Sequence, residues 1–479
     1  MKKFLLFFFV LIAILHINAQ SIVNEILKGN PPSSSSAEVI GCGHFSLMEA
    51  KNQQIVNYIE SMDQQMLQIK KNIAHQKEMR SFGEDEVVKI QMVFHVVYNN
   101  EDENIPDSVL YNQVKILNES FRRTNADTVN TRSEFRNLVG DSKIEFELAQ
   151  KDPAGNPSNG IVRHSTNVEY FGGILPYAAH QQQEIVDWIT DSLYYNLFRI
   201  TKDGLGGSDA WDTDRYFNVW IGDLRIFEPK FNNFEELVFF ALGTPPMEKM
   251  LHWPDSVMEV FKDFEQGVLI HYPIVGGNNP NLLPPPYQPY NNLVKSGKVL
   301  VHEAGHYLGL RHIWGDGDCS FDDFIDDTPN ANSDSQWACN HNRNTCVDDI
   351  FGLDLPDMVE NYMDYSNGAC QNSFTKGQIE MMRYILAQYR GNTLGLERST
   401  LSSDFNLYPN PTSQKVYLQS PAVSSLLKVY IYNPLGQLIY KEEHKNMDII
   451  TLDLEGEKGL YLVKVLSKGQ QTTFKVLKH

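Results

Sequence analysis

The chain has 479 residues, of which 42% are hydrophobic, so it is long enough for two to four globular units. Its 60 acidic and 41 basic side chains give a formal net charge of −19. This balance argues against nucleic acid or an anionic membrane as the main partner, because both would repel the chain.

The first 19 residues have the composition of a secretory signal peptide. Lys2 and Lys3 precede the apolar run FLLFFFVLIAIL, and the segment ends in the small residue Ala19. A membrane anchor is the alternative, but the run is shorter than the roughly 20 residues that a spanning helix needs. No later segment is long and apolar enough to span a membrane, so we predict a secreted protein.

A mixed pattern of strands and helices follows a polar, helix-prone stretch at 20–85 that has no strand pattern. Strands are predicted at 87–98, 144–148, 216–221 and 267–272, and helices begin at Pro106 and near Leu293. His95, inside the first strand, is expected to be a hydrogen-bonded core residue. Residues 224–265 have no clear period and are interpreted as an insertion. The pattern favours an α/β or α+β domain.

The last part of the chain changes character again. Thr375 and Gln378 form a capping box at the start of a helix that reaches about Arg390. From Phe405 onward, short β-type runs at 427–432 and 459–465 are separated by turns. This pattern predicts a small all-β domain at the C-terminus.

Residues 302–312 read HEAGHYLGLRH, which is a strong metal-binding pattern. His302 and His306 are four residues apart and share one helix face. Gly309 allows a sharp turn, which brings His312 back as a third ligand. Three imidazoles leave one coordination position open, as in catalytic zinc sites, and Glu303 is placed to act as the general base. A chance cluster on a surface helix is the alternative.

Four of the five cysteines cluster at Cys319, Cys339, Cys346 and Cys370. In an exported protein such clusters usually form disulfides, and four cysteines allow three pairings between which the sequence does not choose. A second zinc site is the competing interpretation, but no C-x-x-C spacing supports it.

The motif HEAGHYLGLRH and the later stretch NYMDY at 361–365 resemble the zinc signature and the methionine turn of metzincin peptidases, and of the pappalysin family in particular. The resemblance covers about 86–392 and implies an α+β catalytic domain with a twisted mixed sheet, an active-site helix and a C-terminal subdomain. It implies that Met363 is the turn methionine and that Tyr365 stabilises the tetrahedral intermediate.

The same resemblance bears on the acidic, cysteine-rich segment after the motif. It implies disulfides Cys319–Cys346 and Cys339–Cys370, and a structural calcium ion. The candidate calcium ligands are Asp323, Asp326, Asp327 and Thr328, whose hard oxygens suit this ion, although a solvated acidic loop is the alternative. Gly368 departs from the family pattern, which has an acidic residue before the last cysteine.

Cys42 lies ahead of the catalytic domain, in GCGHFSLMEAK. A thiolate is a good fourth zinc ligand, so Cys42 is predicted to block the metal of a zymogen in which 20–85 is the pro-segment. This resembles the cysteine switch of some metzincin zymogens. A free or intermolecular cysteine is the alternative.

The C-terminal stretch 403–479, which follows a linker at 393–402, contains YPNP, N-x-x-G-Q and G-L-Y pieces. It resembles the type A sorting domain of the type IX secretion system, and this implies a β-sandwich that interacts with the secretion machinery. A carbohydrate- or protein-binding β-sandwich is the alternative. The protein is then either released or attached to the bacterial outer surface.

The sequence therefore predicts a secreted zinc endopeptidase, made as a zymogen, that acts on protein or peptide substrates. The main alternative is a cell-surface binding protein or adhesin with a non-catalytic peptidase-like domain. The intact Glu303 disfavours that alternative, because loss of this residue is the simplest route to inactivity. Nothing in the sequence supports a peptidase restricted to chain ends.

Overall fold

The computed structural model describes residues 38–42, 86–174, 194–230, 233–244, 265–283, 287–335, 337–388, 390, 405–424, 427–433, 437–444, 447–467 and 470–479. The predicted signal peptide and most of the predicted pro-segment lie outside these residues. Two compact units are present, Met1–Gly395 and Leu396–His479, and their boundary lies inside the predicted linker. In the described part of the chain, no helix is both long and apolar enough to cross a membrane.

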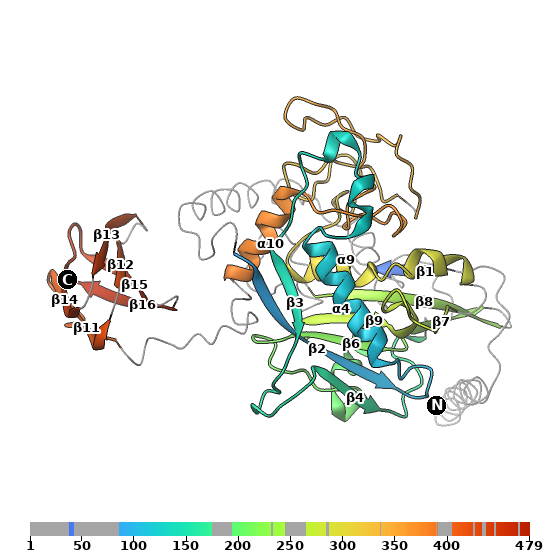
Figure 1. The fold of residues 1–479 in the computed structure, drawn as a ribbon, viewed down its shortest axis with the longest axis horizontal. Helices are drawn as coiled ribbons and strands as arrows, with labels where there is room; N and C mark the ends of the chain where they lie inside the picture. Colours follow the sequence, from blue (N-terminus) through green and yellow to red (C-terminus); the bar gives the residue numbers. More distant parts are fainter. Residues whose placement is uncertain are drawn as a thin grey trace, which may run out of the picture. The chain divides into compact units, whose positions relative to one another are not determined.

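A mixed sheet lies at the centre of the first unit and contains nine strands among the described residues (Figure 1). The main path is β3-β2-β6-β9-β8-β7-β5, with β4 beside β2 and β1 beside β8. Strands β2, β3, β4, β6 and β9 are parallel, whereas β8 is antiparallel to both β9 and β7. The strands are β1 Glu38–Cys42, β2 Val88–Tyr98, β3 Ile144–Leu148, β4 Ile161–Ser165, β5 Gly173–Ile174, β6 Phe217–Gly222, β7 Arg225–Lys230, β8 Asn233–Gly243 and β9 Gly267–His271.

Helices α4 and α9 contact each other and the sheet, α4 at β3 and α9 at β8 and β9. Strands β6 and β9 are buried along their whole length, as expected for central parallel strands. The α-helices are α4 Asp107–Phe121, α6 Tyr194–Phe198, α8 Asn291–Val294, α9 Val299–Tyr307 and α10 Lys376–Gln388. The 3-10 helices are η1 Ala126–Asn130, η2 Ser133–Phe135, η4 Arg199–Thr201, η5 Asp203–Leu205, η6 Tyr272–Ile274 and η7 Gln288–Tyr290.

The predicted strands and the core position of His95 are confirmed. The His95 side chain is fully buried and forms 2.9 Å hydrogen bonds with Ser208 and Asn218. Its ring stacks on Trp220 with 5.2 Å between ring centroids. Burial lowers the pKa of His95 to about 4, so this ring is neutral at neutral pH.

Three expectations about secondary structure are wrong. The stretch 224–265 contains β7 and β8, so part of it belongs to the central sheet. Helix α9 does not begin near Leu293, because Gly297 has φ of 67° and separates it from the short α8. The stretch 20–85 contains β1, which pairs with β8 although the two strands are far apart in sequence.

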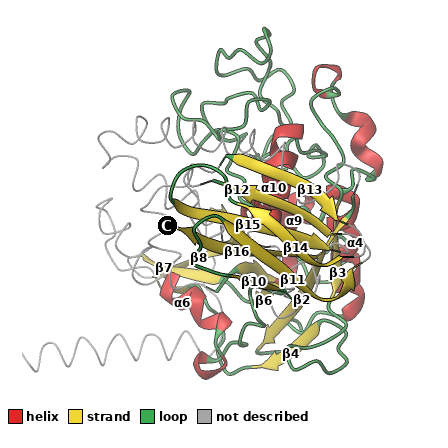
Figure 2. Cartoon of the chain, turned by 90° about the vertical axis from the view of Figure 1, so that its left-hand side faces the viewer, coloured by secondary structure: helices red, strands yellow, loops and turns green. Residues whose placement is uncertain are grey.

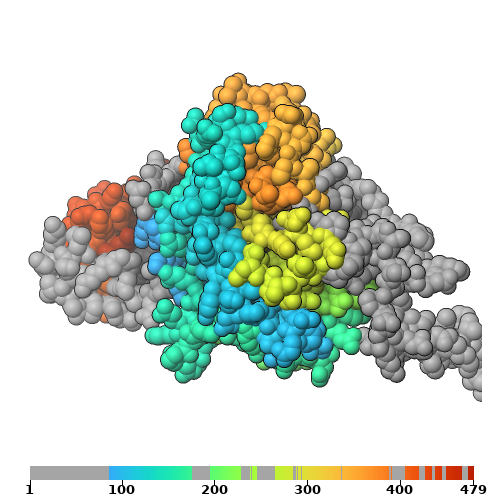
Figure 3. All heavy atoms as spheres, turned by 45° about the vertical axis from the view of Figure 1, so that its right-hand side comes forward, coloured from blue at the N-terminus to red at the C-terminus, as the bar shows by residue number. Residues whose placement is uncertain are grey.

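Loops, drawn in green in Figure 2, make up most of the stretch between α9 and α10. This stretch packs against the segment that follows α4, as the adjoining orange and teal atoms of Figure 3 show. A largely buried ion pair joins the two segments, because the Arg132 guanidinium contacts both carboxylate oxygens of Glu360 at 2.6 and 2.8 Å. Arg132 also donates to the backbone carbonyls of His341 and Asp357.

The second unit consists of two antiparallel sheets with a shared apolar core. One sheet has the order β10-β11-β14 and the other β13-β12-β15-β16. The strands are β10 Asn406–Tyr408, β11 Lys415–Ser424, β12 Leu427–Tyr432, β13 Leu438–His444, β14 Met447–Asp453, β15 Gly459–Ser467 and β16 Gln470–Lys478. The α+β fold followed by a small all-β domain is therefore the predicted one.

Candidate metal centre

Helix α9 and the turn after it bring three histidines together. Leu300, Val301 and Ala304 anchor the helix in the core, which holds His302 and His306 one turn apart on a buried face. Gly309 follows with φ of 91°, a left-handed conformation that glycine adopts without strain. The chain therefore reverses after Leu308 and returns His312 to the same point.

The three Nε2 atoms form a compact tripod. They are separated by 3.1 Å (His302 and His306), 3.1 Å (His306 and His312) and 3.3 Å (His302 and His312). Ligands about 2.0–2.1 Å from a tetrahedral zinc ion lie roughly 3.3 Å apart, so the donor set fits zinc. Among the described residues, these histidines are the one group of three or more His, Cys, Asp or Glu arranged to hold a metal.

The Nδ1 atoms of the three rings hydrogen-bond to protein oxygens, which orients the rings. The partners are the carbonyl of Tyr362 for His302 at 2.7 Å, the carbonyl of Leu310 for His306 at 2.8 Å, and a carboxylate oxygen of Asp316 for His312. A proton on Nδ1 leaves the Nε2 lone pair available for a metal. Burial also lowers the pKa of His302 to about 3, which keeps this ring neutral.

Glu303 lies beside the tripod and is fully buried. Its Oε2 accepts a 2.6 Å hydrogen bond from the backbone N–H of Gly243, the last residue of β8. A Cβ atom at position 243 would lie 2.5 Å from the carbonyl oxygen of Glu303 and 3.1 Å from its Oε2. Glycine is therefore required where the sheet approaches this carboxylate.

An aromatic cluster surrounds the ring of Tyr365. Trp337 stacks on it at 5.4 Å between ring centroids, with 6° between the ring planes. Trp314 meets it edge to face and stacks on His312 at 4.3 Å. The ring of Tyr365 is 5.0 Å from that of His312 and 5.6 Å from that of His302. The phenol is thus held beside the tripod by fixed neighbours.

Met363 packs directly beneath α9. A Cβ atom on Gly305 would lie 2.4 Å from the Met363 sulfur, so helix and turn can approach this closely only because residue 305 is glycine. The Asn361 side chain accepts a hydrogen bond from the Met363 N–H at 2.9 Å and also pairs with Gln378 of α10. The turn is therefore connected to both helices.

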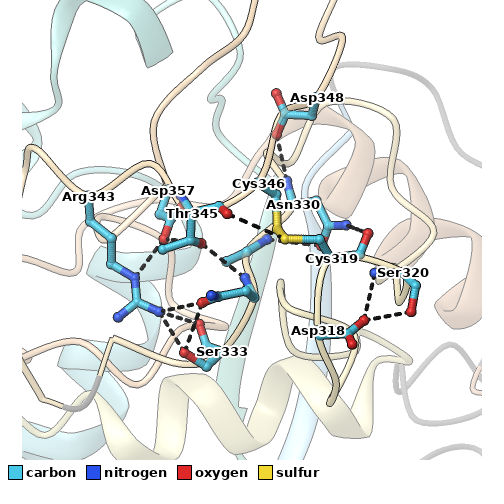
Figure 4. The surroundings of a disulfide bond; sticks show 12 residues. Asp318, Cys319, Ser320, Asn330, Ser333, Arg343, Thr345, Cys346, Asp348 and Asp357 are labelled. Atoms are coloured by element: carbon cyan, nitrogen blue, oxygen red, sulfur yellow. Dashed lines mark hydrogen bonds and ion pairs between the residues drawn. A yellow bond between two sulfur atoms is a disulfide. The ribbon is translucent and has the colours of Figure 1, made fainter.

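Two disulfides hold the loops above the site. The structure joins Cys319 to Cys346 and Cys339 to Cys370, which are the pairs that the family resemblance implied. Figure 4 shows the first, with hydrogen-bonded polar side chains around it. The second joins two segments that meet at the site, because Trp337 lies two residues before Cys339 and Tyr365 lies five residues before Cys370.

The structure does not gather the predicted calcium ligands around one point. Both oxygens of buried Asp323 accept hydrogen bonds from the Thr328 hydroxyl, and burial raises the pKa of Asp323 well above its usual range. Asp327 accepts from the N–H of Gly377 in the first turn of α10, whereas Asp326 is exposed. The hydrogen bonds of Asp323 and Asp327 therefore stabilise the 323–328 loop and the start of α10.

The backbone of the predicted zymogen cysteine lies at the sheet edge that leads to the site. Strand β1 runs parallel to β8, with Cys42 opposite Ala241. Ala241 is two residues before Gly243, the partner of Glu303. The predicted pro-segment therefore reaches the strand that ends at the candidate general base.

Four residues at the site are not apparent from the sequence motif: Gly243, Trp314, Asp316 and Trp337. Asp316 had a local signal, because it follows His312 by four residues in GDGDC. Gly243 and Trp337 had no local signal in the sequence. Gly243 lies 60 residues before its partner Glu303, and Trp337 lies 28 residues before its partner Tyr365.

Comparisons with known proteins identify both units. Residues 286–387 match the peptidase family described as pregnancy-associated plasma protein-A, and 406–479 match a secretion system C-terminal sorting domain. The chain is 39% identical over 101 residues to an extracellular metalloprotease of Arthroderma benhamiae, and 40% identical over 94 residues to one of Pyricularia oryzae. Each match covers 20% of the length of this chain, and 32% or 31% of the length of the relative. The chain therefore spans about a third of the length of the curated relatives that it matches.

Solved structures match over a greater length. A promirolysin mutant of Tannerella forsythia is 32% identical with a TM-score of 0.51, and the match covers 74% of this chain and 95% of that one. Mature mirolysin in complex with a cleaved peptide, from the same organism, is 34% identical with a TM-score of 0.48, covering 64% and 96%.

Proposed function

The chain belongs to the pappalysin family of metallopeptidases and ends in a secretion sorting domain, and on this basis we propose that it is a secreted zinc endopeptidase. The observation that carries the proposal is the tripod of three imidazoles beside the buried Glu303. A binding protein with a degenerate site would have no need to keep the general base next to an intact set of ligands.

Each residue of the site has a role in peptide hydrolysis. His302, His306 and His312 would hold the zinc ion, which supplies Lewis-acid activation of water and of the scissile carbonyl. Glu303 accepts the proton of the attacking water and returns it to the leaving amine, which is general base and then general acid catalysis. The Gly243 N–H donates to the Oε2 of this carboxylate, which helps to orient it for proton transfer.

Tyr365 is proposed to donate its hydroxyl proton in a hydrogen bond to the oxyanion of the tetrahedral intermediate. A preorganised donor of this kind stabilises charge that develops only in the transition state. The stacking of Trp337 and the edge contact of Trp314 support the assignment, because they fix the position of the Tyr365 ring beside the tripod.

Latency is proposed to depend on Cys42 as a fourth metal ligand. The parallel pairing of β1 with β8 supports this, because it brings the backbone of the cysteine next to the strand that ends at Glu303. The similar promirolysin chain is itself a pro-form. Replacement of Cys42 by Ala is expected to give an intact precursor that cleaves peptides before any processing; a precursor variant that stays latent would contradict this role.

The C-terminal unit is proposed to direct export by the type IX secretion machinery, after which the enzyme is released or attached to the outer surface. The match of 406–479 to a sorting domain and the compact unit at Leu396–His479 support this proposal. Deletion of 406–479 should leave the protein in the periplasm of a host that has this machinery, as fractionation would show.

Calcium binding by the 323–328 loop remains a proposal from the family resemblance, carried by the carboxylates of Asp323 and Asp327. Calorimetric titration of the purified protein with calcium tests it. Binding that disappears in Asp323→Asn would support the site, and the absence of heat on titration would contradict it.

The decisive experiment compares the activated wild-type protein with Glu303→Ala on casein or gelatin. The proposal expects that both proteins contain one zinc ion by elemental analysis and that the variant has lost cleavage. Activated wild-type protein that contains zinc and cleaves neither substrate would instead favour the surface-binding alternative.

A further inference from the structure

A buried arginine precedes the third histidine of the tripod. Arg311 is next to His312 in the chain and is 2% exposed. A guanidinium group stays protonated at any pH at which proteins fold, so a full positive charge is enclosed here. Burial of a charge is costly unless an opposite charge lies close to it. The contacts of Arg311 therefore indicate what this charge does.

The Arg311 guanidinium faces the turn that follows His312. Its Nη2 donates a 2.7 Å hydrogen bond to the carbonyl oxygen of Gly315 and lies 3.8 Å from Oδ2 of Asp316. The other oxygen of that carboxylate, Oδ1, contacts Nδ1 of His312. The side chains of Arg311 and Asp316 are 1% and 2% exposed. The Asp316 carboxylate is thus held between a buried cation and a candidate metal-binding ring.

The turn that presents Asp316 is tight and partly strained. The N–H of Gly317 donates to the carbonyl of Trp314 at 3.2 Å, which closes the turn. Its two central residues are both left-handed, with φ of 60° at Gly315 and 61° at Asp316, as in a type I′ turn. Glycine adopts this conformation freely, whereas aspartate adopts it at a cost. Arg311 binds the carbonyl group of the peptide that joins these two residues, so it stabilises the turn at its strained point.

The other contacts of the Arg311 side chain are weaker. Its Nε is shielded from solvent and has no hydrogen-bond partner in the part of the chain that the structure describes. The ring of Phe324 lies under the guanidinium, with 5.3 Å from its centroid to the central carbon of the group. The polar contacts of this cation are therefore directed at Gly315 and Asp316.

We propose that Arg311 is a positioning residue of the metal centre, which holds the 314–317 turn and the Asp316 carboxylate in the orientation that aligns His312 for zinc. The inference rests on the proposed zinc peptidase function. Loss of a carboxylate that orients a metal-binding histidine typically weakens metal binding by about 10–100-fold. Arg311 acts one step further from the metal, through Asp316, so its loss should weaken zinc binding by about tenfold.

The experiment measures the zinc affinity of the activated protein by competition with a chromophoric chelator. It compares Arg311→Met, Asp316→Asn and the double variant with the wild type. Because Arg311 acts through Asp316, the double variant should bind zinc no more than about twofold more weakly than Asp316→Asn alone. A further tenfold loss in the double variant would overturn this route, and wild-type affinity in Arg311→Met would overturn the role altogether.

A second measurement separates positioning from a general loss of stability. Denaturant titration of the zinc-free proteins gives the free energy of unfolding of each variant. Arg132→Met is the matched control, because it removes another largely buried arginine that is paired with a carboxylate, Glu360. It should lower stability while its zinc affinity stays within about twofold of the wild type. Equal loss of zinc affinity in Arg132→Met and Arg311→Met would overturn the proposal.

A conservative variant tests the ion pair. Arg311→Lys keeps a positive charge opposite Asp316 and should bind zinc within about threefold of the wild type. Affinity as low as that of Arg311→Met would contradict the role given to the charge. If Arg311→Met does not fold, Arg311→Gln takes its place with the same expected results.

The wild-type protein distinguishes failure of this inference from failure of the proposed function. A wild type that binds one zinc ion and cleaves peptides, with unchanged zinc affinity in Arg311→Met, would overturn the role of Arg311 alone. A wild type that binds no zinc would overturn the proposed function, and the role of Arg311 with it.

Discussion

The N–H of Gly243 donates a 2.6 Å hydrogen bond to the Oε2 of Glu303, so the end of strand β8 and the candidate general base occupy one site. The contact joins the sheet to helix α9 at Glu303, the residue that is expected to accept the proton of the attacking water. It also limits what residue 243 can be, because a Cβ atom there would lie 2.5 Å from the Glu303 carbonyl oxygen. This relationship leads to the first prediction.

Gly243→Ala should lower kcat/KM by about a hundredfold, because a shift of about 1 Å in a catalytic group has an effect of this size. Zinc content should stay at the wild-type value, since residue 243 supplies none of the three histidine ligands. Peptide kinetics and elemental analysis test this together. Gly204→Ala is the control, because a Cβ atom there meets nothing within 4 Å. Wild-type rates in Gly243→Ala would show that the contact is not needed.

Asp316→Asn should weaken zinc binding by about 10–100-fold, which is typical for loss of a carboxylate that orients a metal-binding histidine. Asp316 contacts Nδ1 of His312 and is 3% exposed. Competition with a chromophoric chelator would measure the affinity. Asp318→Asn changes a carboxylate two residues later that accepts hydrogen bonds from Ser320, and it should bind zinc as the wild type does. Equal affinities for the two variants would contradict the role given to Asp316.

Tyr365→Phe should lower kcat by about 10²–10³-fold with little change in KM, because the hydroxyl group acts on the transition state. The ring remains, so the stacking on Trp337 and the zinc content should be kept. Steady-state kinetics on a single peptide provides the measurement, and Tyr111→Phe, an exposed tyrosine on α4, is the control. A rise in KM alone would indicate that Tyr365 binds the substrate and takes no part in the chemical step.

Glu360→Ala should lower the free energy of unfolding of the first unit by about 3–5 kcal/mol, because it leaves the Arg132 guanidinium in a buried position without its counter-ion. The Glu360 side chain is 1% exposed and that of Arg132 is 12% exposed. Denaturant titration measures the change. Glu119→Ala breaks the exposed pair with Lys115 on α4 and should cost less than about 1 kcal/mol. Similar losses in the two variants would mean that the buried pair adds no more stability than a surface pair.

Acid should destabilise the first unit partly through His95. The pKa of His95 is lowered from 6.5 to about 4 in the folded protein by burial, so between these values the unfolded chain binds a proton that the folded chain does not. The free energy of unfolding should therefore fall by about 3 kcal/mol on account of this residue as pH drops from 6.5 to 4, and His95 should have no effect above 6.5. Denaturant titrations of wild type and His95→Gln across this range test it. Parallel curves would rule out this contribution.

Several features of the site could be predicted because they depend on short spacing. The offset of four residues between His302 and His306 places both on one helix face, and Gly309 can adopt φ of 91° in any context. His95 could be assigned to the core because apolar neighbours on its own strand surround it. The stretch that contains β8 was misread, because β8 lies inside the sheet between β9 and β7, and its sequence NFEELVFFALG has no strict alternation of polar and apolar residues.

The sequence by itself determined that three imidazoles and a carboxylate lie on one helix and the turn after it, since local backbone geometry is enough to bring them together. The tertiary structure alone decided that β8 ends against Glu303, that Trp337 stacks on Tyr365 and that Lys298 meets Asp127. Each of these contacts joins segments at least 28 residues apart, and such contacts arise from the packing of the whole domain, which no local period encodes.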